Sequence, residues 1–187
     1  MIVDLRRLTV AEYHRMGDLG ILAPSESVEL IEGQIIEKPI KGKAHSAAVS
    51  RVDNLLINRL ADRTLVRLQD PVHLSDYSEP EPDIALVKPD PFFYEDHHPQ
   101  PSEIYLIIEV ADTTLKRDRD FKATVYARSG IADYWILDIA NRQLYVFRDP
   151  QANHYQSEAI LNDDATISIL AFPDVQISVA EMFSPIR

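Results

Sequence analysis

The chain of 187 residues contains no cysteine. Disulfides, thiolate zinc sites and a cysteine nucleophile are therefore excluded. Long apolar runs are also missing: the longest have only the length of a β-strand, so no membrane-spanning segment is expected. The first ten residues carry Asp4, Arg6 and Arg7 where a signal peptide would need an apolar centre. Together these absences predict a soluble, cytoplasmic protein.

No Gly/Ser-rich or low-complexity stretch divides the chain into parts. Its length and its hydrophobic fraction of 45% are sufficient for one substantial core. We therefore expect a single domain over residues 1–187.

The net charge of −11 argues against a nucleic-acid partner, because phosphate contacts need clustered Lys and Arg. The charges are unevenly distributed, however. Residues 38–67 hold seven basic and two acidic residues, whereas residues 68–109 hold ten acids and only Lys88. A basic segment beside an acidic one suits a phosphodiester substrate and a cation; the alternative is that both are ordinary solvated surfaces.

Strand and helix patterns alternate along the chain. The helical patterns are a short one over residues 10–16, with a Thr9–Glu12 capping-box spacing, and two longer ones over residues 44–60 and 117–128. Strands are expected in a hairpin over residues 28–36 and at 65–68, 72–74, 84–87, 105–110, 134–138, 143–147, 155–158, 166–170 and 175–177. This order predicts an α+β fold: a mixed β-sheet flanked by two main α-helices, with additional antiparallel strands.

Two acids stand beside or within apolar strand patterns. Asp83 precedes the apolar residues 84–87, and Glu109 lies inside the most apolar segment, residues 104–110. A buried carboxylate is costly unless it is paired, protonated or bound to a cation. The two acids are 26 residues apart, the length of a strand, a loop and a return strand, so both can lie at one sheet edge. With the backbone carbonyl of Val110 as a third ligand, they predict an Mg²⁺ or Mn²⁺ site.

The helix expected after Glu109 carries Asp118, Lys122 and Tyr126 at intervals of four, which places them on one helix face. If that face covers the strand end, Lys122 meets the two carboxylates. An ammonium group there can orient a water or offset charge on a scissile phosphate. These residue types predict metal-assisted hydrolysis.

The same positions carry a resemblance to a known family. The blocks that carry it are the run over residues 28–34, His45 at the head of a helix, Glu81-Pro82-Asp83-Ile84, Glu109-Val110-Ala111-Asp112, Asp118, Lys122-x-x-x-Tyr126 and Gly130-x-x-Asp133-Tyr134-Trp135. In their order and spacing they resemble the Uma2 family of the PD-(D/E)xK nuclease-like superfamily, over residues 8 to about 150. The resemblance implies a restriction-endonuclease-like core.

Position by position, the resemblance implies that Asp83 and Glu109 bind the metal and that Glu29 is an upstream acid completing the site. The broader superfamily has a lysine two residues after the second acid, whereas this chain has Ala111 there. The resemblance implies that Lys122, on the following helix, takes the place of that lysine.

Other polar residues have competing interpretations. His45 is either a surface residue or a contact to phosphate or water. Asp118 is expected to cap its helix or to pair with Lys122 rather than to act directly. His97 and His98 lie in a proline-rich loop with no further ligand at metal spacing, which favours a structural role over a transition-metal site.

Three functions are consistent with these residues. The first is an Mg²⁺- or Mn²⁺-dependent endonuclease with DNA as the expected substrate. The second is a catalytically silent nuclease fold that serves as a binding or assembly module, and the third is a metal-dependent hydrolase of small phosphate esters. We also expect a homodimer, because cutting both strands usually requires two sites and the apolar strands after Tyr134 could pair across a symmetry axis.

Overall fold

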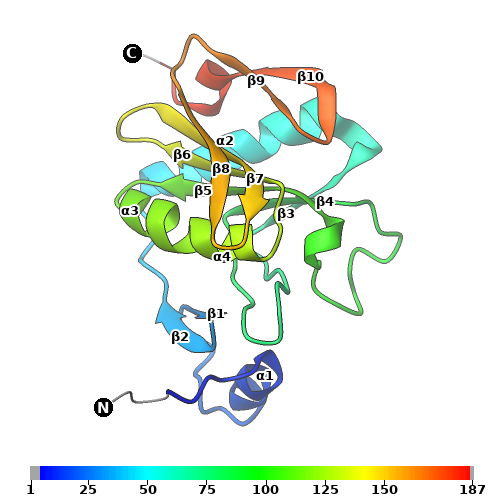
Figure 1. The fold of residues 1–187 in the computed structure, drawn as a ribbon, viewed down its shortest axis with the longest axis vertical. Coiled ribbons are helices and arrows are strands. Elements are labelled where there is room, and N and C mark those ends of the chain that lie inside the picture. The colour runs from blue at the N-terminus through cyan, green and yellow to red at the C-terminus, as the bar shows by residue number, and fades with distance from the viewer. Residues whose placement is uncertain (1–4, 186–187) are drawn as a thin grey trace.

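A six-stranded mixed β-sheet forms the centre of the computed structural model, which describes residues 5–185 (Figure 1). Its strand order is β3-β4-β5-β6-β7-β8. The strands are β3 (Leu65–Leu68), β4 (Ile84–Val87), β5 (Ile104–Ala111), β6 (Asp133–Asp138), β7 (Gln143–Gln151) and β8 (His154–Leu161). Neighbouring strands are antiparallel except β5 and β6, which are parallel and therefore need a crossover connection.

Helices cover both faces of this sheet (Figure 1). On one face, α2 (Lys43–Leu60) packs through an apolar stripe that includes Val49, Val52 and Leu56. On the other face lies the β5–β6 crossover, a continuous helix made of α3 (Leu115–Arg117), a π-helical segment (Asp118–Lys122) and α4 (Ala123–Arg128). Because side chains alternate along a strand, odd-numbered residues of β4, and of β5 from Ile107 onward, face this second helix.

Smaller elements lie at the two ends of the molecule (Figure 1). At the N-terminal end are α1 (Val10–Asp18) and the hairpin of β1 (Val28–Ile31) and β2 (Gln34–Glu37). The opposite end holds the antiparallel pair β9 (Thr166–Ile169) and β10 (Phe172–Ser178), followed by a 3₁₀ turn (Val179–Met182). Two further 3₁₀ turns span Ala61–Arg63 and Pro101–Glu103. None of the helices within residues 5–185 has the length and apolarity needed to cross a membrane.

The α+β fold with two main helices is confirmed, one local prediction is wrong, and one helix differs in detail. Residues 72–74 do not form a strand. Val72 and Leu74 donate hydrogen bonds to the carbonyls of Pro80 and Ser78, but Pro80 has no N–H to return, so no regular ladder forms. The helix predicted from residue 117 begins instead at Leu115, and its middle is π-helical, for which the sequence carries no signal.

Gly33 makes the tight turn between β1 and β2. Glu32 and Gly33 have φ values of 53° and 74°, the left-handed pair that a two-residue hairpin turn requires. Gly33 is also crowded, because a Cβ added there would lie 2.4 Å from the Cβ of Arg7. Its amide donates to the carbonyl of Tyr77 at 2.7 Å, so the turn ties the N-terminal segment to the loop before β4.

Replacing Gly33 by alanine is expected to lower the free energy of unfolding by about 3 kcal/mol, since left-handed strain and overpacking add. Gly130→Ala is the matched control. Gly130 has a φ of 77° but no neighbour within 4 Å of an added Cβ, so only the strain of about 1 kcal/mol applies. Urea denaturation of both variants measures the difference; equal losses would show that the contact with Arg7 relaxes at no cost.

Candidate metal-binding active site

Asp83 and Glu109 lie on adjacent strands at one end of the sheet. The antiparallel register of β4 and β5 pairs Ile84 with Ile108, which brings Asp83, just before β4, beside Glu109 of β5. The Val110 amide donates to Oδ2 of Asp83 at 2.9 Å, and this contact fixes the first carboxylate against the strand that carries the second. Both acids are buried.

Asp83 is held by two further side chains. His45, in the first turn of α2, and Gln69, just after β3, approach Oδ1 of Asp83 at 3.0 and 3.2 Å through their Nε2 atoms. Burial favours the neutral acid, but the contacts with His45 and with the Val110 amide outweigh burial and lower the pKa of Asp83. The contact with Asp83 in turn raises the pKa of His45, so the pair favours a carboxylate beside an imidazolium.

Glu109 points to the sheet face that is covered by the crossover helix. Its Oε1 accepts hydrogen bonds from Nζ of Lys122 at 2.9 Å and from the Tyr126 hydroxyl at 2.8 Å. Within residues 5–185 no hydrogen bond reaches Oε2 of Glu109, although the residue is only 4% exposed. Burial raises the pKa of Glu109 to about 8, against the opposing effect of Lys122. The two hydrogen bonds anchor Oε1 of Glu109, and Oε2 is available to a ligand.

Lys122 lies between two buried carboxylates. Besides Glu109, its Nζ lies 3.4 Å from Oε1 of Glu29, a fully buried residue of β1. Burial opposes the positive charge of Lys122, but Glu109 and Glu29 outweigh burial and raise its pKa above the ordinary value. Lys122 is therefore an ammonium group at neutral pH and serves as a proton donor in hydrogen bonds, not as a base.

Glu29 contacts Lys122 but does not line the cavity that is described below. Its carboxylate also accepts from Arg117 at 2.7 Å and from the Glu81 amide at 3.1 Å. Glu29 is joined to the cavity through Arg117, Glu81 and Lys122, which do line it. Asp118 is buried and accepts a hydrogen bond from the Thr114 hydroxyl at 2.6 Å, while burial raises its pKa.

A cavity opens where these groups meet. Its walls come from the loop before α2, the C-terminal end of β5 and the start of the crossover helix. The lining side chains are Lys38, Pro39, Ile40, Lys41, Gly42, His45, Glu81, Asp83, Glu109, Val110, Asp112, Thr113, Thr114, Arg117, Asp118 and Lys122. The cavity thus collects five carboxylates together with a comparable number of basic groups.

The donor set fits a hard divalent cation. Asp83, Glu109 and Val110 line one cavity and carry oxygen atoms, and Mg²⁺ and Mn²⁺ prefer such ligands. The observation that favours a cation is that Oε2 of Glu109 accepts no hydrogen bond within residues 5–185, while Oε1 is held by Lys122 and Tyr126. These residues are suited to hold Mg²⁺ or Mn²⁺ with water completing the coordination.

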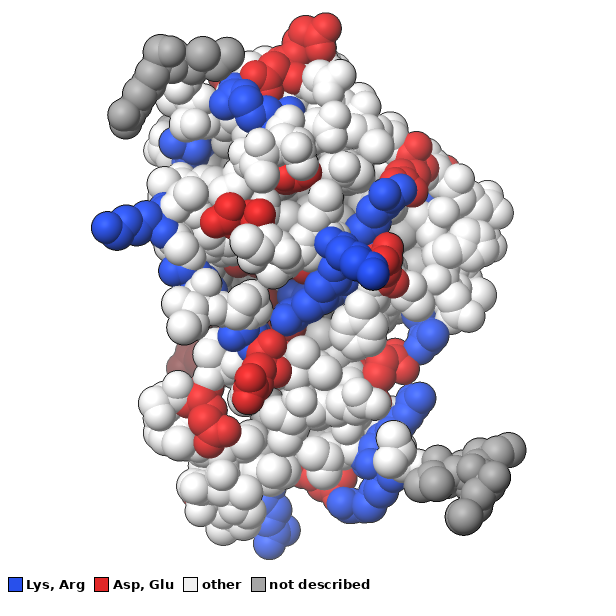
Figure 2. Space-filling model, turned by 90° about the vertical axis from the view of Figure 1, so that its left-hand side faces the viewer, with Lys and Arg blue, Asp and Glu red and all other residues white. Residues whose placement is uncertain are grey.

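The predicted basic segment is only partly at the cavity. Of its seven basic residues, Lys38 and Lys41 line the cavity, whereas Arg59, Arg63 and Arg67 form ion pairs with acids elsewhere. The face seen in the space-filling view has a diagonal band of Lys and Arg with Asp and Glu beside it, so it is not uniformly basic (Figure 2). The basic segment is therefore partly neutralised by acids, two of which, Asp174 and Glu181, come from a distant part of the sequence.

Two residues that hold the site were missed by sequence analysis. Arg117 reaches Glu29 from 88 positions away, and Gln69 reaches Asp83 from 14 positions away. Both are ordinary polar residues in their local context, with no spacing that marks them. The nearest signal was the capping and pairing expected around Asp118, one residue after Arg117.

Comparisons with known proteins indicate the family and the fold of the chain. The family model Uma2, described as "Putative restriction endonuclease", matches residues 10–180. A crystal structure of "a putative nuclease belonging to DUF820" from Anabaena variabilis is similar, with a TM-score of 0.71 and 20% sequence identity. The similarity covers 94% of this chain and 97% of that one. A search of curated proteins gave no match.

Proposed function

The chain belongs to the Uma2 family, and from the geometry of its cavity we propose that it is a divalent-metal-dependent nuclease that hydrolyses phosphodiester bonds in DNA. The observation that carries this proposal is the meeting of Asp83, Glu109 and Lys122 in one cavity, with Lys122 at 2.9 Å from Glu109. Metal-assisted hydrolysis of phosphate needs two hard oxygen ligands and an adjacent positive charge.

Each residue has a distinct role in this proposal. Asp83, Glu109 and the Val110 carbonyl hold the cation, which when bound supplies Lewis acidity and lowers the pKa of a bound water. His45 and the Val110 amide keep Asp83 ionised and oriented. Tyr126 fixes Oε1 of Glu109, so that Oε2 faces the ligand.

Lys122 supplies the positive charge. As an ammonium group it orients the attacking water by donating a hydrogen bond and offsets the charge that builds on the phosphate. Glu29 is proposed as a positioning residue that acts through Lys122 and as a supplementary acid of the site. Asp118 is proposed to hold the start of the helix through Thr114. The superfamily has a lysine at the position of Ala111. In this proposal the site still has that positive charge, because Lys122 provides it from the helix.

The direct test is cleavage of supercoiled DNA by the purified chain with Mg²⁺ or Mn²⁺. We expect nicked or linear products that require the cation and disappear with EDTA. Titration of Mn²⁺ in the absence of DNA separates the alternatives. Cation binding without cleavage of DNA or RNA would favour the silent binding module, and the absence of both would overturn the proposal.

Lys41 is expected to contact the phosphate backbone, since it lines the cavity and no ion pair involves it within residues 5–185. Lys41→Ala should weaken DNA binding several-fold and lower the slope of log K against log salt by about 1. The control is Arg63→Ala. The cavity lies at the first turn of α2, whereas Arg63 follows the last turn of this 18-residue helix, which is about 27 Å long. Arg63 is also already paired with Asp174. The Arg63→Ala variant should therefore leave the salt slope unchanged.

The same titration addresses small phosphate esters as substrates. For a hydrolase of small esters, the affinity for DNA would not depend on salt concentration. Lys41→Ala would then not reduce activity on long substrates more than activity on short ones. Fluorescence anisotropy of a labelled duplex between about 50 and 200 mM salt covers the useful range. An unchanged slope in Lys41→Ala would remove the argument for a polyanionic substrate.

A homodimer remains part of the proposal, and the expected pairing through the strands after Tyr134 narrows to one of them. Both β6 and β7 have neighbouring strands on each side within the chain. The sheet edges are β3 and β8. Of these, β8 is the longer and mostly exposed strand, so an edge-to-edge dimer would use β8.

A further inference from the structure

Histidines gather in a second pocket. Four of the six histidines of the chain line it: His14, His73, His97 and His98. None of the residues that line this pocket lines the cavity around Asp83. The walls come from α1, from the loop before β4 and from the proline-rich loop before β5, three segments that are far apart in the sequence.

A buried acid lies at the centre of this pocket. Glu79 is 3% exposed, and its described side-chain contacts are to imidazoles: Oε1 lies 2.5 Å from Nε2 of His14, and Oε2 lies 3.3 Å from Nδ1 of His73. Two other deeply buried acids pair with arginine instead. Glu29 pairs with Arg117, and Asp133 pairs with Arg148. Within residues 5–185, no Lys or Arg forms an ion pair with Glu79.

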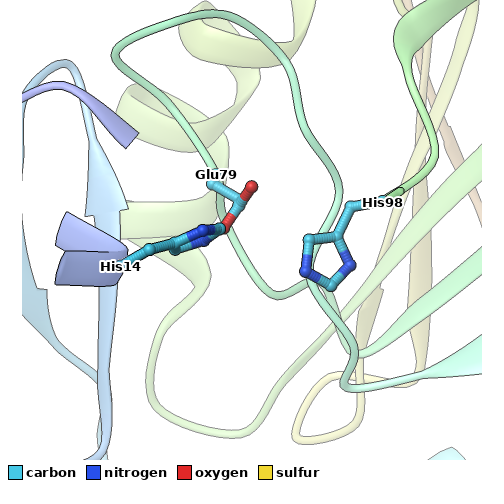
Figure 3. A group of neighbouring side chains, drawn as sticks. All are labelled: His14, Glu79 and His98. Carbon is cyan, nitrogen blue, oxygen red and sulfur yellow. The ribbon is translucent and has the colours of Figure 1, made fainter. Parts of the chain in front are cut away.

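His98 completes a three-sided arrangement with Glu79 and His14. Donor atoms of the three side chains all lie within 4.8 Å of one another. Figure 3 shows His14 reaching Glu79 from α1, with His98 on the facing loop on the other side. Nδ1 of His98 is buried and has no hydrogen-bond partner within residues 5–185. A buried ring nitrogen without a partner is costly, so this position favours a ligand.

We propose that His14, Glu79 and His98 bind one zinc ion, at a site distinct from the Asp83–Glu109 cavity. Two imidazoles and one carboxylate are a usual zinc ligand set, with water in a fourth position. The set suits zinc and other imidazole-preferring transition metals better than Mg²⁺, which prefers oxygen ligands.

The geometry requires only small side-chain movements. Around a tetrahedral zinc ion with bonds of about 2.0 Å, neighbouring donor atoms lie about 3.3 Å apart. The donor atoms of His14, Glu79 and His98 lie at most 4.8 Å apart, which is longer than this value. The contact between His14 and Glu79, at 2.5 Å, is shorter. Burial lowers the pKa of His98, which keeps its imidazole neutral as a ligand must be.

The bound ion would join three separate segments of the chain. His14 belongs to α1, Glu79 to the loop before β4 and His98 to the proline-rich loop. Because the metal binds the folded arrangement, it would stabilise the attachment of α1 to the rest of the protein. This role is structural and independent of catalysis at Asp83.

His97 provides the matched control. It is the direct sequence neighbour of His98 and lines the same pocket, but its two ring nitrogens contact Asp96 at 2.6 Å and Glu103 at 3.3 Å. It is therefore already partnered away from Glu79, and His97→Gln should not affect the zinc site.

The experiment uses the full chain, stripped with EDTA and dialysed, and measures binding of Zn²⁺ by calorimetry and of Co²⁺ by its visible absorption. An Asp83→Asn background removes competition from the first cavity. We expect one equivalent of Zn²⁺, a rise in melting temperature with added Zn²⁺, and a Co²⁺ spectrum typical of four or five ligands with nitrogen donors. His14→Ala and His98→Ala should each lower affinity at least about 10-fold, whereas His97→Gln should match the parent.

Circular dichroism without metal checks that the variants are folded. His14→Gln and His98→Gln serve as milder substitutions if the alanine variants unfold. Zinc affinity that is unchanged in both His14 and His98 variants would overturn the proposal, as would the absence of zinc binding in the Asp83→Asn parent. The test is independent of nuclease activity, so failure of the proposed function would leave its outcome readable.

Discussion

Asp83→Ala is expected to lower cation-dependent DNA cleavage by at least about 10³-fold, because it removes one of the two carboxylates proposed to hold the metal. It also releases His45 and Gln69, which both contact Oδ1 of Asp83. Asp83→Asn keeps the size and some of these contacts but removes the charge, and it should lose nearly as much activity. Mn²⁺ titration should show the matching loss of affinity.

The control for this prediction is Asp70→Ala. Asp70 also lies in the segment between β3 and β4, but its side chain is half-exposed and pairs with Arg67, away from the cavity. Its removal should leave cleavage within about a factor of two, since exposed ion pairs contribute little. If Asp83→Ala retains parental cleavage and Mn²⁺ affinity, the assignment of the cation site is wrong.

Lys122→Met is expected to combine a loss of cleavage with a loss of about 3–5 kcal/mol in the free energy of unfolding. The lysine is 4% exposed and lies between Glu109 and Glu29, so methionine leaves the buried Glu109 without a cation and leaves Glu29 with Arg117 alone.

A second substitution separates the structural and catalytic effects of Lys122. Glu29→Gln in the Lys122→Met background lowers the negative charge around the missing ammonium group, while Arg117 keeps its hydrogen bond to the Glu37 carbonyl. The double variant should recover part of the lost stability, measured by urea denaturation. Cleavage should not recover, because the positive charge is still absent. Lys116→Met, an exposed position on the same helix, is the control and should change neither quantity. Recovery of cleavage in the double variant would show that Lys122 acts only through stability.

The sequence predicted best those site residues whose positions follow from the pattern of a single strand or helix. Asp83 and Glu109 stand out because each interrupts or borders an apolar run, and β4 and β5 pair antiparallel as such adjacent strands usually do. Lys122 and Tyr126 were placed on one helix face from their spacing of four, and both do reach Glu109. Period-based arguments succeed for these residues because short-range geometry decides their direction.

The sequence was least informative where contacts join distant segments. Glu79 is one acid among ten in its region, and nothing nearby indicates that His14, 65 positions earlier, contacts it. His98 was assigned no metal partner for the same reason. The π-helical segment is equally invisible, since its extra residue per turn depends on packing, including a hydrogen bond from the Tyr134 hydroxyl to the Asp118 carbonyl at 3.1 Å.

The parallel pairing of β5 with β6 also governs the order in which the site can be assembled during synthesis. β4 and β5 are consecutive and antiparallel, so Asp83 and Glu109 can meet as soon as residue 111 has left the ribosome. Lys122 arrives later, on the crossover helix, whose Tyr126 packs against Tyr134 of β6, a residue that is synthesised later still. A nascent chain therefore holds its paired acids before it holds the charge that completes them.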